Sequence, residues 1–137
     1  MKITELHNSG SIRPLKYPLH EVPHVTIEPN RTCNLNCEAC YNIDRQTIKS
    51  LRETKKEIDC ALRKRKLETA TIVGGEPTMH KQITAIVKYI KSKGLMCQMF
   101  TNGVVFLHDK DDGLLNRLIA AGIDRIFLHI EIGRAHV

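Results

Sequence analysis

Residues 70–100, ATIVGGEPTMHKQITAIVKYIKSKGLMCQMF, contain one complete strand–helix–strand pattern. A short β-branched run at 70–73 precedes a segment at 81–93 whose apolar residues keep helical spacing, and a second apolar run follows at 95–100. Gly94 lies between these two segments, where a glycine commonly ends a helix. A helix that connects two short apolar strands is typical of parallel β-sheets, so this stretch predicts an α/β fold.

The same alternation continues on both sides of this stretch. HVTIEP (24–29) and RIFLHI (125–130) predict a first and a fourth strand, and helices are predicted at about 46–66 and 112–121. The helix at 46–66 is expected to bury an apolar stripe that begins at Ile48.

Size and composition fit a soluble globular protein with a single folded domain. The chain has 137 residues, of which 42% are hydrophobic and 26% are charged. We assign the domain to residues 24–131 and an N-terminal extension to residues 1–23. The extension has no apolar run long enough for a signal peptide or a membrane span, so we expect a cytoplasmic protein with no membrane partner.

The formal net charge of +6 would suit a polyanionic partner. Eight basic residues lie in the predicted helix at 46–66, namely Lys49, Arg52, Lys55, Lys56, Arg63, Lys64, Arg65 and Lys66. Aromatic residues do not interleave with them, as they would in a surface that stacks on bases. We interpret the run as a solvated helix face and keep nucleic acid as the alternative partner.

Three cysteines lie in the loop after the first strand, in CNLNCEACY (33–41). Their C-x3-C-x2-C spacing favours an iron–sulfur cluster over zinc, because zinc would need a fourth ligand and neither His24 nor His80 lies at a familiar zinc-finger distance. Three cysteines can hold three irons of a cubane cluster and leave one iron open. On spacing alone, a zinc-stabilised nucleic-acid-binding module and an iron–sulfur electron carrier remain alternatives. Cys60 and Cys97 are interpreted as structural cysteines.

Two further motifs follow the second and third strands. GGEP (74–77) is either a tight turn or a place where a ligand reaches backbone carbonyls, with Glu76 as acceptor for a cationic amine. TNG (101–103) contains a common turn dipeptide, but a helical segment and not a paired strand follows it. Ligands of parallel β/α folds gather at the carboxyl ends of the strands, so all three motifs are expected at one edge of the sheet.

The order of these motifs resembles that of the radical S-adenosyl-L-methionine (radical SAM) enzymes, over about residues 22–131. The resemblance implies a partial (β/α) TIM-like barrel of parallel strands, truncated here after about four of them. It also implies a set of metal ligands, Cys33, Cys37 and Cys40, which would hold three irons of a 4Fe-4S cluster. The implied SAM-binding residues are Tyr41 beside the adenine, Gly74, Gly75, Glu76 and Pro77 at the methionine amino group, Asn102 on the cofactor side of the barrel, and Glu131 at the ribose.

The resemblance further implies a reaction. SAM would chelate the open iron through its amino and carboxylate groups, and an electron from a reductant such as flavodoxin or ferredoxin would cleave it to a 5′-deoxyadenosyl radical. That radical would abstract hydrogen from an unidentified substrate, so no hydrolytic triad is needed. Peptide maturation, cofactor assembly and nucleic-acid modification all fit, because specificity in this family resides largely in later strands and carboxyl-terminal extensions.

The last residues, IGRAHV (132–137), depart from the β/α pattern. One back-translation of residues 131–137, GAG ATC GGA AGA GCA CAC GTC, matches a widely used short-read sequencing adaptor after its first base. We therefore expect that the natural chain is interrupted inside codon 131, and that the chain as written is unstable or inactive although its intact parent is an enzyme. A genomic contig that continues through this codon with the same translation would contradict this expectation.

Overall fold

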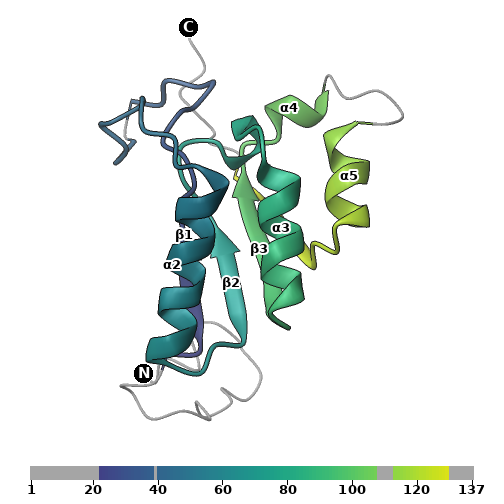
Figure 1. The fold of residues 1–137 in the computed structure, drawn as a ribbon. Coiled ribbons are helices and arrows are strands. Elements are labelled where there is room, and N and C mark those ends of the chain that lie inside the picture. Colours follow the sequence, from purple (N-terminus) through teal and green to yellow (C-terminus); the bar gives the residue numbers. More distant parts are fainter. Residues whose placement is uncertain (1–21, 39, 108–112, 130–137) are drawn as a thin grey trace, which may run out of the picture.

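The computed structural model describes residues 22–38, 40–107 and 113–129. Its elements in chain order (Figure 1) are β1 (His24–Ile27), α2 (Leu51–Lys64), β2 (Thr69–Ile72), the 3-10 helix η1 (Pro77–Met79), α3 (Ile83–Ser92), β3 (Met96–Thr101), α4 (Val104–Leu107), α5 (Leu114–Ala120) and β4 (Arg125–Leu128). The four predicted strands and the three predicted helices are present. Sequence analysis missed η1 and α4 because three or four residues are too few to show a helical period.

The predictions for residues 1–21, for Glu131 and for the segment 132–137 concern residues that the structure does not describe. Among the described residues, none of the helices combines the length and the apolar character needed to cross a bilayer.

The four strands form one sheet in the order β1-β2-β3-β4, and every neighbouring pair is parallel. Ile27 pairs with Ile72, Ile72 with Met99, and Met99 with Ile126, so the strands run in step across the sheet. The predicted α/β fold with a parallel sheet is therefore confirmed. Because the strands are parallel, the loops that follow them all emerge at one edge.

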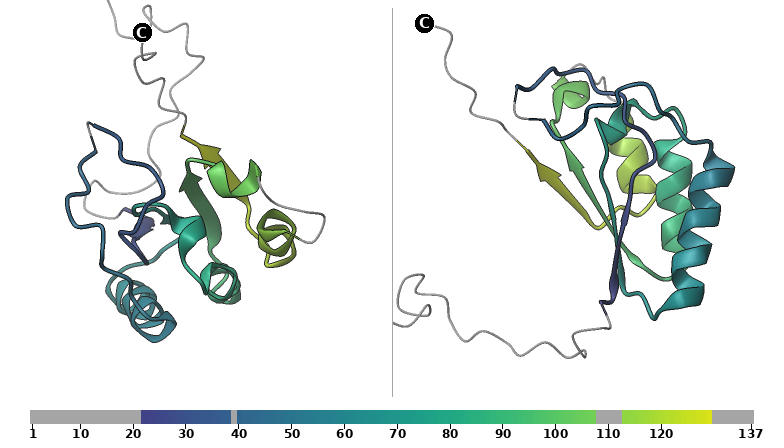
Figure 2. Two further views of the ribbon diagram at one scale, coloured as in Figure 1. Left: turned by 90° about the horizontal axis from the view of Figure 1, so that it is seen from above. Right: turned by 90° about the vertical axis from the view of Figure 1, so that its left-hand side faces the viewer.

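Helices α2, α3 and α5 cover one face of the sheet, as Figure 2 shows from two directions. Alternate strand residues point toward these helices because side chains of a strand alternate between its two faces. The buried core consists of strand residues Val25, Ile27, Ala70, Ile72, Cys97 and Met99 and of helix residues Ile58, Ile83, Ile86, Val87, Ile90, Leu114 and Leu118. This core fixes the sheet against the helices and leaves the carboxyl edge free for loops.

The residues that alternate with the core residues form a polar row on the other face. Thr26, Thr71, Gln98 and Arg125 occupy matching positions on the four strands. Thr71 Oγ1 lies 2.8 Å from His24 Nε2 and donates to Gln98 Oε1 at 3.3 Å. The face away from the helices therefore carries this polar row together with the stacked rings of Phe100 and Phe127, whose centroids lie 4.8 Å apart.

Helix α2 begins later than predicted. Ser50 is its N-cap: the Ser50 hydroxyl accepts from the backbone N–H of Glu53 at 3.2 Å, and a Glu53 carboxylate oxygen accepts from the Ser50 N–H at 2.7 Å. This capping box stops the helix from extending to 46–49. Ile48, assigned to the helix from its spacing, instead forms an isolated bridge with Asn30 and is 59% exposed.

We expect Ser50→Ala to lower the free energy of unfolding by about 1 kcal/mol, because it removes the cap of α2. Ser92→Ala is the matched control: Ser92 is exposed in the last turn of α3 and donates only to the Tyr89 carbonyl. The control should change the stability by less than about 0.5 kcal/mol. Urea unfolding followed by circular dichroism measures both, and equal effects of the two substitutions would contradict the assignment of the cap.

Candidate functional site

Three loops meet at the carboxyl edge of the sheet, above the strand ends in Figure 1. The loop after β2 is joined to the loop after β1 by backbone hydrogen bonds, from Gly75 N–H to the Asn30 carbonyl at 3.1 Å and from Glu76 N–H to the Thr32 carbonyl at 2.8 Å. The loop after β3 joins them through Asn102, whose N–H donates to Glu76 Oε2 at 2.8 Å. The expectation that the three sequence motifs share one edge is therefore confirmed.

The two glycines of GGEP allow the first two loops to touch. A Cβ atom on Gly74, whose φ is +146°, would lie 2.2 Å from the Asn30 carbonyl oxygen. A Cβ atom on Gly75 would lie 2.3 Å from the Thr32 carbonyl oxygen. Both distances are far shorter than a van der Waals contact, so any side chain would force the loops apart. The atoms that approach the two glycines closely are backbone carbonyl oxygens of the protein itself, those of Asn30 and Thr32.

Glu76 is buried, with 1% of its surface exposed, and its carboxylate accepts four hydrogen bonds. Oε1 accepts from the N–H and hydroxyl of Thr78 at 3.0 and 2.5 Å and from the Thr101 hydroxyl at 2.6 Å. Of the donors in the described ranges, Asn102 N–H alone bonds to Oε2, so this oxygen retains capacity for another donor. The side chain therefore binds η1 to the end of β3 from the inside.

Asn102 connects this buried carboxylate to the cysteine loop. Its side-chain Nδ2 donates to Asn34 Oδ1 at 2.7 Å and to Cys33 Sγ at 3.9 Å, and its Oδ1 accepts from Val104 N–H at 3.0 Å. The last of these bonds closes a turn between Asn102 and Val104, the first residue of α4.

The cysteine loop lies further from the core than the other two loops. Cys33 and Cys37 are half-buried and Cys40 is exposed. The structure describes all five cysteines of the chain, and none of them forms a disulfide. Across the described ranges, no three His, Cys, Asp or Glu side chains are grouped closely enough to hold a metal ion. The three thiols are thus carried by one loop but are not gathered at one point.

The donor set nevertheless fits an iron–sulfur cluster. Three thiols on a single polar loop supply the ligands that such clusters use. Two amide oxygens beside the loop, Asn30 Oδ1 and Asn42 Oδ1, are buried and have no hydrogen-bond partner in the described part of the chain, although both residues donate through their Nδ2 atoms. Unsatisfied buried acceptors are rare in folded proteins, and they indicate that the loop can still gain contacts.

Tyr41 is 73% exposed, and its hydroxyl donates to the Gly74 carbonyl across 3.5 Å, at the long limit of a hydrogen bond. Pro77 is buried and begins η1. Tyr41 thus contacts GGEP across the two loops. Glu131, the last of the predicted SAM-binding residues, lies outside the described residues.

Sequence analysis missed Asn30 and Asn42 as parts of this site, and it included Thr101 in TNG without giving it a role of its own. Asn30 is 1% exposed and donates to the Glu76 carbonyl at 3.0 Å, while Asn42 donates to the Arg31 carbonyl at 2.7 Å. Asn30 could have been found from the sequence, because it is a polar residue directly after the predicted strand 24–29. The roles of Asn42 and Thr101 depend on contacts between loops that the sequence does not reveal.

The histidines considered as zinc ligands bond elsewhere, His24 to the Thr71 hydroxyl and His80 to the Lys49 carbonyl, both at 2.8 Å.

Cys97 lies in the core under the helices, where burial raises the pKa of its thiol to about 12 and keeps it protonated. Cys60 is half-buried in α2. Neither of these two cysteines adds a ligand to the cysteine loop.

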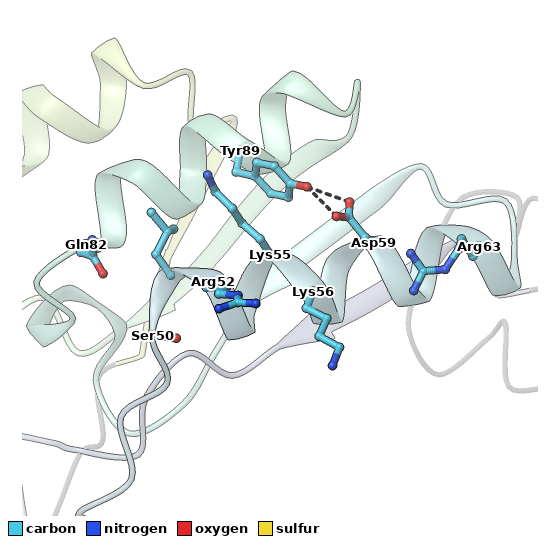
Figure 3. Close-up of a pocket in the computed structure, with 9 residues that line it drawn as sticks. Ser50, Arg52, Lys55, Lys56, Asp59, Arg63, Gln82 and Tyr89 are labelled. Carbon is cyan, nitrogen blue, oxygen red and sulfur yellow. Dashed lines mark hydrogen bonds between the residues drawn. The ribbon is translucent and has the colours of Figure 1, made fainter.

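A separate hollow of about 720 Å³ lies on the outer helices α2 and α3 (Figure 3). Its lining includes the basic residues Arg52, Lys55, Lys56 and Arg63 and the acidic residue Asp59. The Asp59 carboxylate forms an ion pair with Lys93 at 2.9 Å and accepts a hydrogen bond from the Tyr89 hydroxyl. Lys93 has the larger effect of the two, and both lower the pKa of Asp59 below its usual value. No residue of the three motifs lines this hollow, so we place the candidate site at the carboxyl edge.

Comparison with known proteins gives relatives that are enzymes. The chain is 29% identical over 87 residues to an S-adenosylmethionine-dependent nucleotide dehydratase of Selenomonas ruminantium, covering 63% of this chain and 32% of that protein. It is 27% identical over 103 residues to 7-carboxy-7-deazaguanine synthase of Aquifex aeolicus, covering 73% and 47%. The chain therefore spans less than half the length of these two curated relatives.

Solved structures with the same fold include Streptococcus suis SuiB bound to its precursor peptide SuiA, with a TM-score of 0.60 and 18% identity over 77% of this chain and 23% of SuiB. At that identity the likeness shows the fold alone. The model of the Radical SAM superfamily matches residues 27–137. Because this match covers most of the sequence, the chain belongs to the radical SAM superfamily.

Proposed function

We propose that Cys33, Cys37 and Cys40 bind a 4Fe-4S cluster and that the protein reductively cleaves SAM. The observation that supports this most directly is the junction of three loops, in which Asn102 bonds both to the GGEP carboxylate and to the cysteine loop. Members of the superfamily use SAM and a 4Fe-4S cluster. When bound, the cluster supplies the electron that cleaves SAM to a 5′-deoxyadenosyl radical, which abstracts hydrogen from a substrate.

The chain's own residues bind and orient the cosubstrate. Among the described residues the Gly74 carbonyl accepts only the long bond from Tyr41, so an ammonium group can replace that contact. Glu76 Oε2 accepts one hydrogen bond from the described residues and keeps acceptor capacity for a second donor. Gly74 to Pro77 thus form the proposed site for the SAM amino group, with Tyr41 beside the adenine, Asn102 on the cofactor side and Glu131 at the ribose.

The remaining partners follow from this chemistry. A one-electron reductant such as flavodoxin or ferredoxin supplies the electron, and the hydrogen donor is an unidentified substrate. The protein works in the cytoplasm in this proposal, since none of its five cysteines forms a disulfide.

Anaerobic reconstitution with iron and sulfide tests the ligand set. The purified chain should turn brown, with visible absorption that bleaches on reduction, and alanine at Cys33, Cys37 or Cys40 should abolish or strongly reduce the bound iron. Cys60→Ala is the control and should leave the iron content unchanged, because Cys60 lies in α2. A colourless protein that binds zinc would support the zinc module instead. A cluster whose EPR spectrum does not respond to SAM would support the electron carrier.

Glu76→Gln tests the proposed amine site and the buried bridge separately. The amide keeps the size of the carboxylate but replaces one acceptor oxygen with a donor, so we expect the free energy of unfolding to fall by about 1–3 kcal/mol. Binding of SAM to the reconstituted protein should weaken at least tenfold. Glu57→Gln, at a surface ion pair with Lys49, is the control and should change stability by less than about 0.5 kcal/mol. Unchanged SAM affinity with reduced stability would leave Glu76 as a structural bridge only.

A further inference from the structure

The proposed function uses the Asn102 side chain to join the loops, but it assigns no effect to the contact of Asn102 with the Cys33 sulfur. Its Nδ2 atom donates to Cys33 Sγ at 3.9 Å, within the range for a hydrogen bond to sulfur, although 69 residues separate the two positions. Nδ2 carries two hydrogens, so it can serve Asn34 Oδ1 at 2.7 Å and the sulfur together. Asn102 therefore lies beside one particular cysteine of the loop.

Two further bonds hold Asn102 in place, one at its side-chain amide and one at its backbone. Asn102 Oδ1 accepts from Val104 N–H at 3.0 Å, so the opposite end of the amide, Nδ2, must face the cysteine loop. Its backbone N–H is held by Glu76 Oε2, and Glu76 is itself buried and bonded to Thr78 and Thr101. A donor held in this way is directed at the sulfur before any ligand arrives.

Cys33 also accepts from the backbone N–H of Leu35 at 3.4 Å. Its sulfur thus has two N–H donors, one from its own loop and one from the end of β3. Hydrogen bonds to the sulfur ligands are among the features that set the reduction potential of an iron–sulfur cluster. Reduction adds negative charge, so a donor at the sulfur stabilises the reduced form more than the oxidised form.

We propose that Asn102 is a positioning residue that donates a hydrogen bond to the Cys33 sulfur and thereby raises the reduction potential of the cluster bound there. This inference rests on the proposed function, because it needs a cluster on Cys33. It gives the TNG motif a task beyond lining the cofactor side: the asparagine couples the buried Glu76 to the redox centre.

The test is a one-electron reductive titration with dithionite, followed by EPR, of the reconstituted 137-residue chain and two variants. Asn102→Asp keeps an oxygen that can cap Val104 but removes the donor, and Asn102→Ala removes the donor without adding charge. Both should shift the midpoint to a more negative potential. At the native midpoint, the ratio of reduced to oxidised cluster should fall at least threefold, which is about 30 mV at 59 mV per tenfold change.

Asn36→Ala is the matched control, since Asn36 is exposed on the same loop, and it should leave the midpoint unchanged. Iron and sulfide are counted in each sample to show that the cluster is complete. A negative shift in the aspartate variant alone would assign the effect to its charge and overturn the hydrogen bond, as would native potentials in both variants. Failure of the unsubstituted chain to assemble any cluster would instead refute the proposed function and this inference with it.

Discussion

The buried carboxylate of Glu76 holds the candidate site together. A charge with 1% exposure is costly unless it is fully hydrogen-bonded, and four donors from Thr78, Thr101 and Asn102 meet this requirement. These donors come from η1 and from the end of β3, so the bridge joins the loops that follow two neighbouring strands. Loss of the Glu76 carboxylate would remove its hydrogen bonds to Thr78, Thr101 and Asn102, which connect the two loops.

Each residue of GGEP has a structural role that does not depend on a ligand. Gly74 and Gly75 permit backbone contact with the loop after β1, Glu76 makes the bridge, and Pro77 begins η1. A motif that identifies a cofactor site from sequence is therefore also a packing motif. The proposed contact with the SAM amino group depends on atoms that this packing leaves available, the Gly74 carbonyl and Glu76 Oε2.

The cysteine loop contrasts with the bridged loops. Its thiols are not grouped, Cys40 is exposed, and the amide oxygens of Asn30 and Asn42 lack partners. Binding of a metal centre commonly completes the folding of the segment that carries its ligands. Asn102 lies at the boundary between the two regions, since it bonds to the rigid Glu76 on one side and to Asn34 and Cys33 on the other.

The sequence by itself determined the order of strands and helices, the parallel α/β class and the edge at which the motifs gather. The hydrophobic period is a local property of the sequence, and the gathering of loops at the carboxyl ends of parallel strands follows from the order of the elements. Both can therefore be predicted from a single sequence. It misplaced the start of α2, because the spacing of Ile48 fits a helix while the Ser50 capping box starts the helix only at Leu51. Only the tertiary structure decided that the glycines meet the Asn30 and Thr32 carbonyls, that Glu76 is buried, and that Asn102 reaches Cys33. These are contacts between residues far apart in the chain, and their geometry exists only once the core between sheet and helices brings the strand ends together.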